Sequence, residues 1–247
     1  MNNGYLHIRS TEAIWLNPDQ NVFTGLNKVC IWRIKTSDFL SESESFMLIL
    51  NLEETERILR YKSATNRKTR IISRAVLRIL LGRYLSLDPI EIIFELDLHK
   101  KPVLKNASDK PIHFNVSHSG DWILIAVSAN PIGIDLERID ASFTYQNLLD
   151  FSFDIEEKSY IQKSRFPVET FYQLWTRKEA LLKANGKGLV DELDLIPSLD
   201  GLYQNPDQLI NSGQSWEITS FSIDENHIGS AAFMPVKTAL QFLNFQL

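Results

Sequence analysis

The sequence predicts a globular protein of the α+β class, built either as one large domain or as two halves of similar size. Short apolar runs rich in β-branched residues occur in both halves together with longer amphipathic patterns, which favours strands packed against helices. Apolar residues make up 44% and charged residues 23% of the 247 residues, as is typical of a chain that folds around its own core. If there are two halves, the boundary between them is expected near residues 129–131, where Ala-Asn-Pro is a turn signal.

The first half is expected to contain strands and two helices. We predict a buried strand over residues 29–34 and a short helix over 53–61. A long helix is expected to begin at an N-cap formed by Asn66 and to end at Leu85, with an apolar stripe on one face. Further strands are expected over 90–96 and 112–116.

The second half begins with strands and then becomes helical. Residues 122–128 and 132–136 read as strands, and the turn between them predicts a hairpin. Helices are expected over 153–163 and 168–184, and Asn185-Gly186 has the chemistry of a left-handed cap that ends the second helix. Strand-like patterns return over 215–223 and 228–234.

Charge is distributed unevenly along the chain. Of the 26 Lys and Arg residues, nine lie between Arg57 and Arg83, a segment without Asp or Glu, and the other 17 stand against all 31 acidic residues. A basic segment on an acidic protein indicates a bounded anion site more than a broad nucleic-acid surface. We therefore expect no nucleic-acid partner.

The sequence also favours a cytoplasmic protein with no membrane partner. No apolar run approaches the ~20 residues that cross a bilayer. The N-terminus lacks the basic-then-apolar order of a secretion signal. The single cysteine, Cys30, cannot form an internal disulfide and is expected to be a small buried residue.

Three carboxylates and a lysine have spacings that suit a metal ion and a phosphate. Asp135 and Glu137 alternate along an expected strand, so both side chains point to one face, roughly 6–7 Å apart. Glu179 and Lys183 are one helical turn apart, so they are neighbours on the surface of an expected helix. A few carboxylate ligands that leave room for water and phosphate oxygens suit magnesium. These residues therefore outline a phosphate-handling site.

Each of these features also has a simpler interpretation. Asp135 and Glu137 are compatible with a solvated strand face, and Glu179 with Lys183 is compatible with a surface ion pair worth a few tenths of a kcal/mol. The arginines of the long basic helix are compatible with a solvated face, and His118 with a capping or packing role. Only the joint order of the motifs favours function.

That order resembles one protein family. Residues 114–120 read Phe-Asn-Val-Ser-His-Ser-Gly, residues 133–137 read Gly-Ile-Asp-Leu-Glu, and a run from Trp175 reads Trp-Thr-Arg-Lys-Glu-Ala-Leu-Leu-Lys-Ala. Blocks that fit the same order occur at residues 29–32, 56–81 and 101–102. Together they resemble the 4′-phosphopantetheinyl transferases of the Sfp type.

This resemblance implies an enzyme that moves the 4′-phosphopantetheine group of coenzyme A to a serine of an apo acyl, peptidyl or polyketide carrier protein. Adenosine 3′,5′-bisphosphate is the other product. The implied fold has two similar α/β subdomains related by a pseudo-two-fold, with a ligand cleft between them. We expect residues 1–130 to carry the basic helix and the coenzyme A contacts, and residues 131–247 to carry the metal-binding acids and the catalytic helix. A monomer is expected.

The resemblance also assigns roles to single residues. Asp135, Glu137 and Glu179 fall on magnesium-binding acids, and Glu179 and Lys183 on the catalytic positions. The positions that match coenzyme A contacts are Arg70, Lys101, Ser117 and His118. The spacing from Lys101 to Ser117 is longer than in the family pattern, so Lys100 is the alternative to Lys101. The first 28 residues and the loop 205–215 have no counterpart.

Two other functions fit parts of the same pattern. A metal-dependent nuclease would also use acids, a Glu/Lys pair and a basic helix, although the net charge of −5 and the helical spacing of the pair argue against it. A module that binds coenzyme A without catalysis is the other alternative. The presence of all three acids and of Lys183 argues against loss of catalysis.

Overall fold

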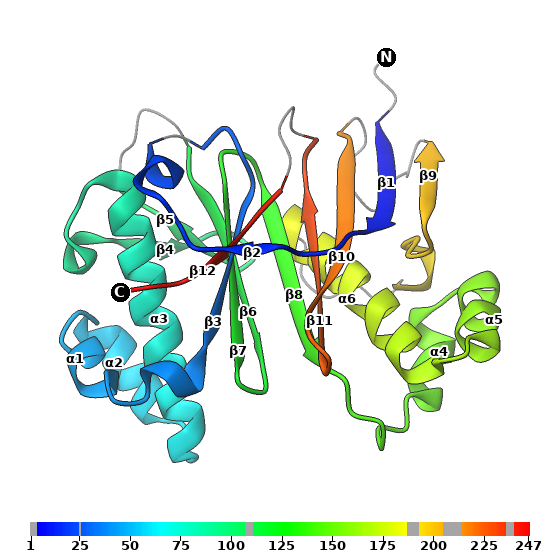
Figure 1. Cartoon of the computed structure of the whole chain (residues 1–247), viewed down its shortest axis with the longest axis horizontal. Helices are drawn as coiled ribbons and strands as arrows, with labels where there is room; N and C mark the ends of the chain where they lie inside the picture. The colour runs from blue at the N-terminus through cyan, green and yellow to red at the C-terminus, as the bar shows by residue number, and fades with distance from the viewer. Residues whose placement is uncertain (1–3, 25, 107–110, 187–192, 205–213, 236–239) are drawn as a thin grey trace.

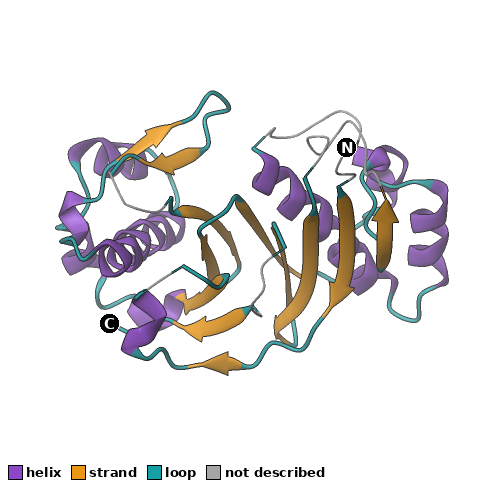
Figure 2. Cartoon of the chain, turned by 90° about the horizontal axis from the view of Figure 1, so that it is seen from above, coloured by secondary structure: helices purple, strands orange, loops and turns teal. Residues whose placement is uncertain are grey.

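Two five-stranded sheets pack face to face, and each is covered on its outer side by a long helix (Figures 1 and 2). The structure, a computed structural model, describes residues 4–24, 26–106, 111–186, 193–204, 214–235 and 240–247. The loop 205–215, which has no counterpart in the family pattern, lies almost entirely outside the described residues. No helix among the described residues is long and apolar enough to cross a membrane.

The first sheet carries helix α3 (Ala64–Leu85), which packs onto it through Ile72, Val76 and Leu80. In spatial order its strands are β2 (Trp15–Leu16), β12 (Gln241–Asn244), β3 (Cys30–Lys35), β7 (Trp122–Ser128) and β6 (His113–Ser119). The smaller elements of this half are η1 (Gln20–Phe23), η2 (Thr36–Phe39), α1 (Ser43–Met47), α2 (Leu52–Leu59), η3 (Pro89–Glu91), β4 (Phe94–Leu96) and β5 (Pro102–Leu104).

The second sheet carries helix α6 (Pro167–Asn185), which packs onto it through Ala180, Leu181 and Ala184. In spatial order its strands are β8 (Ile132–Arg138), β11 (His227–Phe233), β10 (Trp216–Asp224), β1 (Tyr5–Ser10) and β9 (Gly201–Gln204). The smaller helices of this half are α4 (Gln146–Ser152), α5 (Ile155–Lys163) and η4 (Leu193–Leu195).

The two sheets follow the same plan, which confirms the expected pair of similar α/β subdomains. Counted from β6 in one sheet and from β8 in the other, the first two strand pairings are antiparallel and the third is parallel. In each sheet the fourth strand comes from the opposite end of the chain: β12 lies beside β3, and β1 lies beside β10. The division at residue 130 stays a prediction, and both chain ends cross it.

Alternation along the strands explains why the sheets have a helix on one face and a second sheet on the other. In β7, Ile123 and Ile125 belong to the core under α3, whereas Leu124 and Ala126 belong to the core between the two sheets. Successive side chains of a strand point to opposite faces. A strand that is apolar on both faces is therefore buried on both.

The predicted hairpin between residues 122–128 and 132–136 is wrong. Strand β7 pairs with β3 and β6, whereas β8 pairs with β11, so the turn at 129–131 carries the chain from one sheet to the other. Short turn signals specify a reversal but not hydrogen bonding between the strands they join. Strand β7 is apolar on both faces and β8 is apolar on the face toward the other sheet, and each strand pairs with partners elsewhere in the chain.

Several helix ends differ from the expected ones by a few residues. Helix α3 begins at Ala64 because Ser63 is its N-cap and accepts a hydrogen bond from the Asn66 amide, so Asn66 is not the cap. The expected strand over 90–96 is shortened to β4 because residues 89–91 form a 3₁₀ turn. The left-handed cap at the end of α6 is confirmed, with Gly186 at a φ of 73°.

Candidate active site

Strand β8, which carries the two predicted strand acids, lies beside β6 where the edges of the two sheets meet. Ile134 and Leu136 are buried in the core between the sheets, and the alternate positions 135 and 137 face the other way. Asp135 is only 3% exposed, and Glu137 is partly buried. The interpretation as a solvated strand face is therefore wrong for Asp135.

Helix α6 lies directly against β8 because Gly133 has no side chain. A Cβ at this position would overlap the Ala180 carbonyl oxygen and the Ala184 amide nitrogen, which are backbone atoms of the helix. The close approach places Glu179 and Lys183 in the same open cavity as Asp135, a cavity of about 390 Å³. Glycine in the Gly-Ile-Asp-Leu-Glu block thus permits the contact that assembles the site.

Asp135 is the centre of the hydrogen bonds in this cavity. The Lys183 ammonium lies 2.5 Å from Asp135 Oδ1, and the Ser117 hydroxyl donates to the same oxygen at 3.1 Å. The ion-pair partner of Lys183 is therefore a buried acid of the strand, and the interpretation of Glu179 with Lys183 as a simple surface pair is wrong. Asp135 Oδ2 is buried without a hydrogen-bond partner among the described residues.

The surroundings of Glu137 and Glu179 disfavour the charged forms of these two carboxylates. Burial and the charge of Asp135 raise the pKa of Glu137 to about 7, and the same two causes raise the pKa of Glu179. A bound cation would stabilise the charged forms and would give the unpartnered oxygen of Asp135 a ligand. The donor set therefore fits a divalent cation such as magnesium.

The three acids do not by themselves form a complete metal site. Among the described residues, no group of three or more His, Cys, Asp or Glu side chains is arranged to hold a metal ion. Magnesium is usually held by one or two carboxylates together with water and substrate phosphates, so a complete protein cage is not required.

Strand β6 fixes the position of β8 through side chains. The Ile134 amide donates to Asn115 Oδ1 at 2.9 Å, and the Ser119 hydroxyl donates to Glu137 Oε2 at 3.2 Å. With Ser117, these residues occupy alternate positions of β6 and face β8 as a row. Sequence reasoning missed Asn115 and Ser119, although the alternation in Asn-Val-Ser-His-Ser is a signal for such a row.

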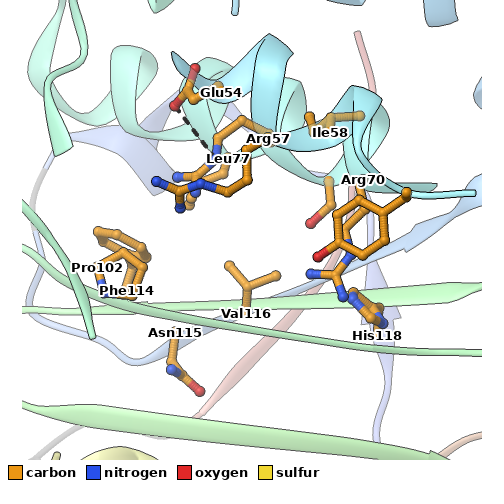
Figure 3. Close-up of a pocket in the computed structure, with 13 residues that line it drawn as sticks. Glu54, Arg57, Ile58, Arg70, Leu77, Pro102, Phe114, Asn115, Val116 and His118 are labelled. Carbon is orange, nitrogen blue, oxygen red and sulfur yellow. Dashed lines mark ion pairs between the residues drawn. The ribbon is translucent and has the colours of Figure 1, made fainter. Parts of the chain in front are cut away.

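A second cavity, of about 340 Å³, adjoins the acids and is lined by cationic side chains. Val116 and His118 line both cavities, so the two are neighbours. Figure 3 shows Arg70 and His118 together at one end of the second cavity and Pro102 with Phe114 at the other. A packing role alone does not explain a histidine that faces both hollows.

The electrostatics of this cavity favour an anion. Burial lowers the pKa of His118, and the positive charges of Arg70 and Lys183 lower it further, so three basic groups act on one region. The Arg70 guanidinium lies 4.9 Å from the centre of the Tyr61 ring. A phosphate at this end would accept charge-assisted hydrogen bonds from a guanidinium already held in place.

Two other arginines of α3 form ion pairs within the protein. The solvated-face interpretation is wrong for Arg78. Arg78 is 1% exposed; it forms an ion pair with Glu54 at 2.9 Å and donates to the Ile92 carbonyl. Arg74 forms a longer ion pair with the same glutamate at 3.5 Å. Arg78 therefore anchors the helix.

Lys101 lines neither of these two cavities, but it lines a third one, of about 390 Å³, that shares Pro102 with the second. Its ammonium donates to the carbonyl oxygens of Ile132 and Lys183. Lys100 is exposed in the preceding turn, with a φ of 62°. A contact between either lysine and coenzyme A stays a prediction.

Comparison with known proteins identifies the class of enzyme that this fold and site define. Residues 32–130 match the family model of the 4′-phosphopantetheinyl transferase N-terminal domain, and residues 131–231 match that of the 4′-phosphopantetheinyl transferase superfamily. The chain belongs to this superfamily, as an Sfp-like 4′-phosphopantetheinyl transferase.

Individual relatives agree with this assignment. A 4′-phosphopantetheinyl transferase of Bacillus subtilis is 32% identical over 158 residues, which cover 62% of this chain and 67% of the relative. Sfp of Bacillus subtilis strain 168 is 30% identical over the same shares of both chains. HetI, a 4′-phosphopantetheinyl transferase of a Nostoc strain, is 26% identical over 227 residues, which cover 90% of this chain and 94% of HetI.

Proposed function

We propose that the chain transfers 4′-phosphopantetheine from coenzyme A to a serine hydroxyl of an apo carrier protein. The observation that carries the proposal is the pair of adjoining cavities, one with Arg70 and His118 and the other with Asp135 and Lys183. Coenzyme A has a pyrophosphate next to the reacting centre and a further phosphate on its adenosine. A cationic cavity beside a carboxylate cavity suits both parts of that donor.

Magnesium is the proposed cofactor, and Asp135, Glu137 and Glu179 are the residues that would hold it. When bound, the ion would neutralise charge on the pyrophosphate oxygens as the leaving group departs. The unpartnered oxygen of Asp135 supports this assignment, together with the position of one buried and two partly buried acids beside one lysine.

The remaining chemistry belongs to the protein's own groups. The serine oxygen of the carrier forms a bond to the phosphorus that carries pantetheine, and the bond from that phosphorus to the bridging oxygen breaks. Adenosine 3′,5′-bisphosphate leaves. Glu179 is proposed to accept the serine proton, directly or through a water. Lys183 is proposed to stabilise negative charge on the phosphate, because its ammonium already lies within the cavity.

Arg70, Ser117 and His118 are the proposed coenzyme A contacts supported by the cavity geometry. Arg70 and His118 line the cationic cavity, and Ser117 lies where the two halves meet, 3.1 Å from Asp135. Both cavities are formed within one chain, so we propose a monomer as the active unit. Size-exclusion chromatography at assay concentration tests that part, and an obligatory dimer would contradict it.

The direct test is incubation with coenzyme A and a panel of apo acyl, peptidyl and polyketide carrier proteins. Mass spectrometry should show one phosphopantetheine added to the carrier serine, with equimolar adenosine 3′,5′-bisphosphate. Activity should stop in excess EDTA and return with magnesium or manganese, but poorly with calcium. Coenzyme A binding without transfer to any carrier would reject the proposal, and full activity in EDTA would reject its metal.

A further inference from the structure

We propose that Lys101 is a positioning residue, which fixes the last turn of α6 against β8 and thereby sets the place of Lys183. Its relevance to transfer rests on the proposed function, whereas its effect on the helix does not. This role differs from that of a coenzyme A ligand, because the residue would act through another side chain.

The ammonium of Lys101 joins three segments that are far apart in the sequence. It comes from the N-terminal half, directly before β5, and donates to the Ile132 carbonyl at 3.2 Å and the Lys183 carbonyl at 2.5 Å. Ile132 is the first residue of β8, the strand of the buried acids, and Lys183 lies in the last turn of α6. One cation thus holds strand and helix together.

The place of this contact matters because helix ends lack backbone partners. The last four carbonyls of an α-helix have no intrahelical donor, and Lys183 is among the last four residues of α6. A cation at a helix C-terminus also complements the helix dipole. The same turn packs on Gly133, where helix and strand backbones touch. Lys101 therefore secures the point of closest approach.

The side chain of Lys183 depends on this anchor. Its backbone carbonyl is held by Lys101, while its ammonium reaches Asp135 Oδ1 at 2.5 Å. If the last turn of α6 lifted from β8, the lysine would move relative to the acid. A misplacement of about 1 Å in an active site can lower a rate about 100-fold.

Lys101 is itself held in place by its own turn. The Lys101 amide donates to Asp97 Oδ1 at 2.8 Å, and the Asp97 amide donates to the Lys101 carbonyl at 3.0 Å. Burial lowers the pKa of its ammonium to about 8, which is the cost of placing a cation among backbone carbonyls instead of in solvent. A surface lysine has no such surroundings.

The first experiment compares Lys101→Met with Lys105→Met. Lys105 follows β5 and forms an exposed pair with Glu95 at 3.6 Å, so it offers the same substitution nearby without the anchor. We expect Lys101→Met to lower kcat about 10- to 100-fold and to change the KM for coenzyme A less than about threefold. Lys105→Met should leave both constants unchanged.

Amide hydrogen exchange provides a reading that needs no substrate. The last turn of α6, which includes the bond from the Gly186 amide to the Leu182 carbonyl, should exchange faster in Lys101→Met than in Lys105→Met. This result would stand even if the proposed donor or acceptor were wrong. Unchanged exchange would overturn the proposal.

A double-mutant cycle with Lys183→Ala tests whether Lys101 acts through Lys183. The kcat loss from Lys101→Met should shrink to less than about threefold when Lys183 is already absent. An equal loss in both backgrounds would overturn the proposal, since the two residues would then act independently. A large rise in the coenzyme A KM with unchanged kcat would do the same and would identify Lys101 as a ligand.

Discussion

Helices α3 and α6 cover corresponding positions on the two sheets, and each is anchored by a buried cation. In α3, Arg78 pairs with Glu54 at 2.9 Å. In α6, Lys178 pairs with Glu157 at 2.7 Å, and both side chains are 1% exposed. A buried pair of this kind is costly to break, because removal of one partner leaves an uncompensated charge. The two halves therefore fasten their long helices in the same way.

The helices differ in what they present beside the anchor. Helix α3 presents Arg70, a cation, to a cavity that already contains His118, whereas α6 presents Glu179 and Lys183 to the acid Asp135. The first arrangement can hold an anion, and the second can hold a cation and stabilise a reacting phosphate. Under the proposed function, α3 would serve binding and α6 would serve chemistry, and substitutions in the two helices should then separate KM from kcat.

The largest expected effect is that of Asp135→Asn. We expect kcat to fall at least about 10³-fold, since this change removes a proposed metal ligand and the partner of Lys183. The fold should persist, because Lys183 is 30% exposed and can turn to solvent, and because one of several crowded carboxylates loses its charge. Transfer is read by mass spectrometry and folding by thermal unfolding.

Asp150→Asn is the matched control, since that acid is 82% exposed, pairs with Lys158 and is not among the described residues that line either cavity. It should transfer at the normal rate. Near-normal turnover of Asp135→Asn would exclude the carboxylate of Asp135 as an essential metal ligand.

Next in size are Glu179→Gln and Lys183→Ala, which should behave differently in magnesium. Both are expected to lower kcat about 10²- to 10³-fold. High magnesium should recover part of the loss in Glu179→Gln, where the metal is weakened, but not in Lys183→Ala, where no added cation takes the ammonium position. The measurement is kcat against magnesium concentration.

If Glu179 and Lys183 had no role beyond that of an ordinary surface ion pair, each substitution would lower stability by less than about 1 kcal/mol and leave turnover near normal. Equal magnesium rescue of both variants would contradict the division of roles between them.

Gly133→Ala should affect the half of the molecule that contains α6, because it changes a contact between the backbones of β8 and α6. The added Cβ would overlap backbone atoms of α6, which cannot move aside as a side-chain end can. We expect a loss of about 1–3 kcal/mol in the free energy of unfolding, together with a fall of about 100-fold in kcat as the helix shifts. Denaturant unfolding and steady-state kinetics read the two effects, and a variant with normal kcat would show that the contact is not needed for alignment.

The sequence predicted the residues of the site better than their partners. Alternation placed Asp135 and Glu137 on one face, and the helical pattern placed Glu179 one turn from Lys183. Neither pattern shows that Lys183 pairs with Asp135, because that contact joins residues 48 positions apart. Such pairs depend on how helix and strand pack.

The sequence also does not distinguish an arginine that anchors a helix from an arginine that lines a binding cavity. Arg70 and Arg78 both belong to a basic, amphipathic stretch, yet only Arg70 lines the cationic cavity and only Arg78 is buried. The sequence also did not reveal that each end of the chain adds a strand to the sheet of the other half, because nothing in β1 or β12 specifies its pairing partner.

A smaller effect on turnover is expected for Arg70→Ala, in the helix of the binding half. A charge-assisted hydrogen bond to phosphate is worth about 1.5–3 kcal/mol, so the KM for coenzyme A should rise tens to hundreds of fold while kcat changes little. Dephospho-coenzyme A, which lacks the 3′-phosphate, is the diagnostic substrate. Equal weakening of both substrates would exclude a contact between Arg70 and that phosphate.

The smallest effect on turnover is expected for Arg78→Met, which removes the anchor of α3. Of its ion pairs with α3, Glu54 would keep only the longer one with Arg74 at 3.5 Å, so unfolding should require about 3–5 kcal/mol less free energy. Arg78 is not among the described residues that line the cationic cavity, so kcat and the coenzyme A KM of folded enzyme should stay near normal. Lys158→Met, which breaks an exposed pair, should cost less than about 1 kcal/mol. A raised KM with normal stability would make Arg78 a ligand and would end the distinction between anchor and binding residues in α3.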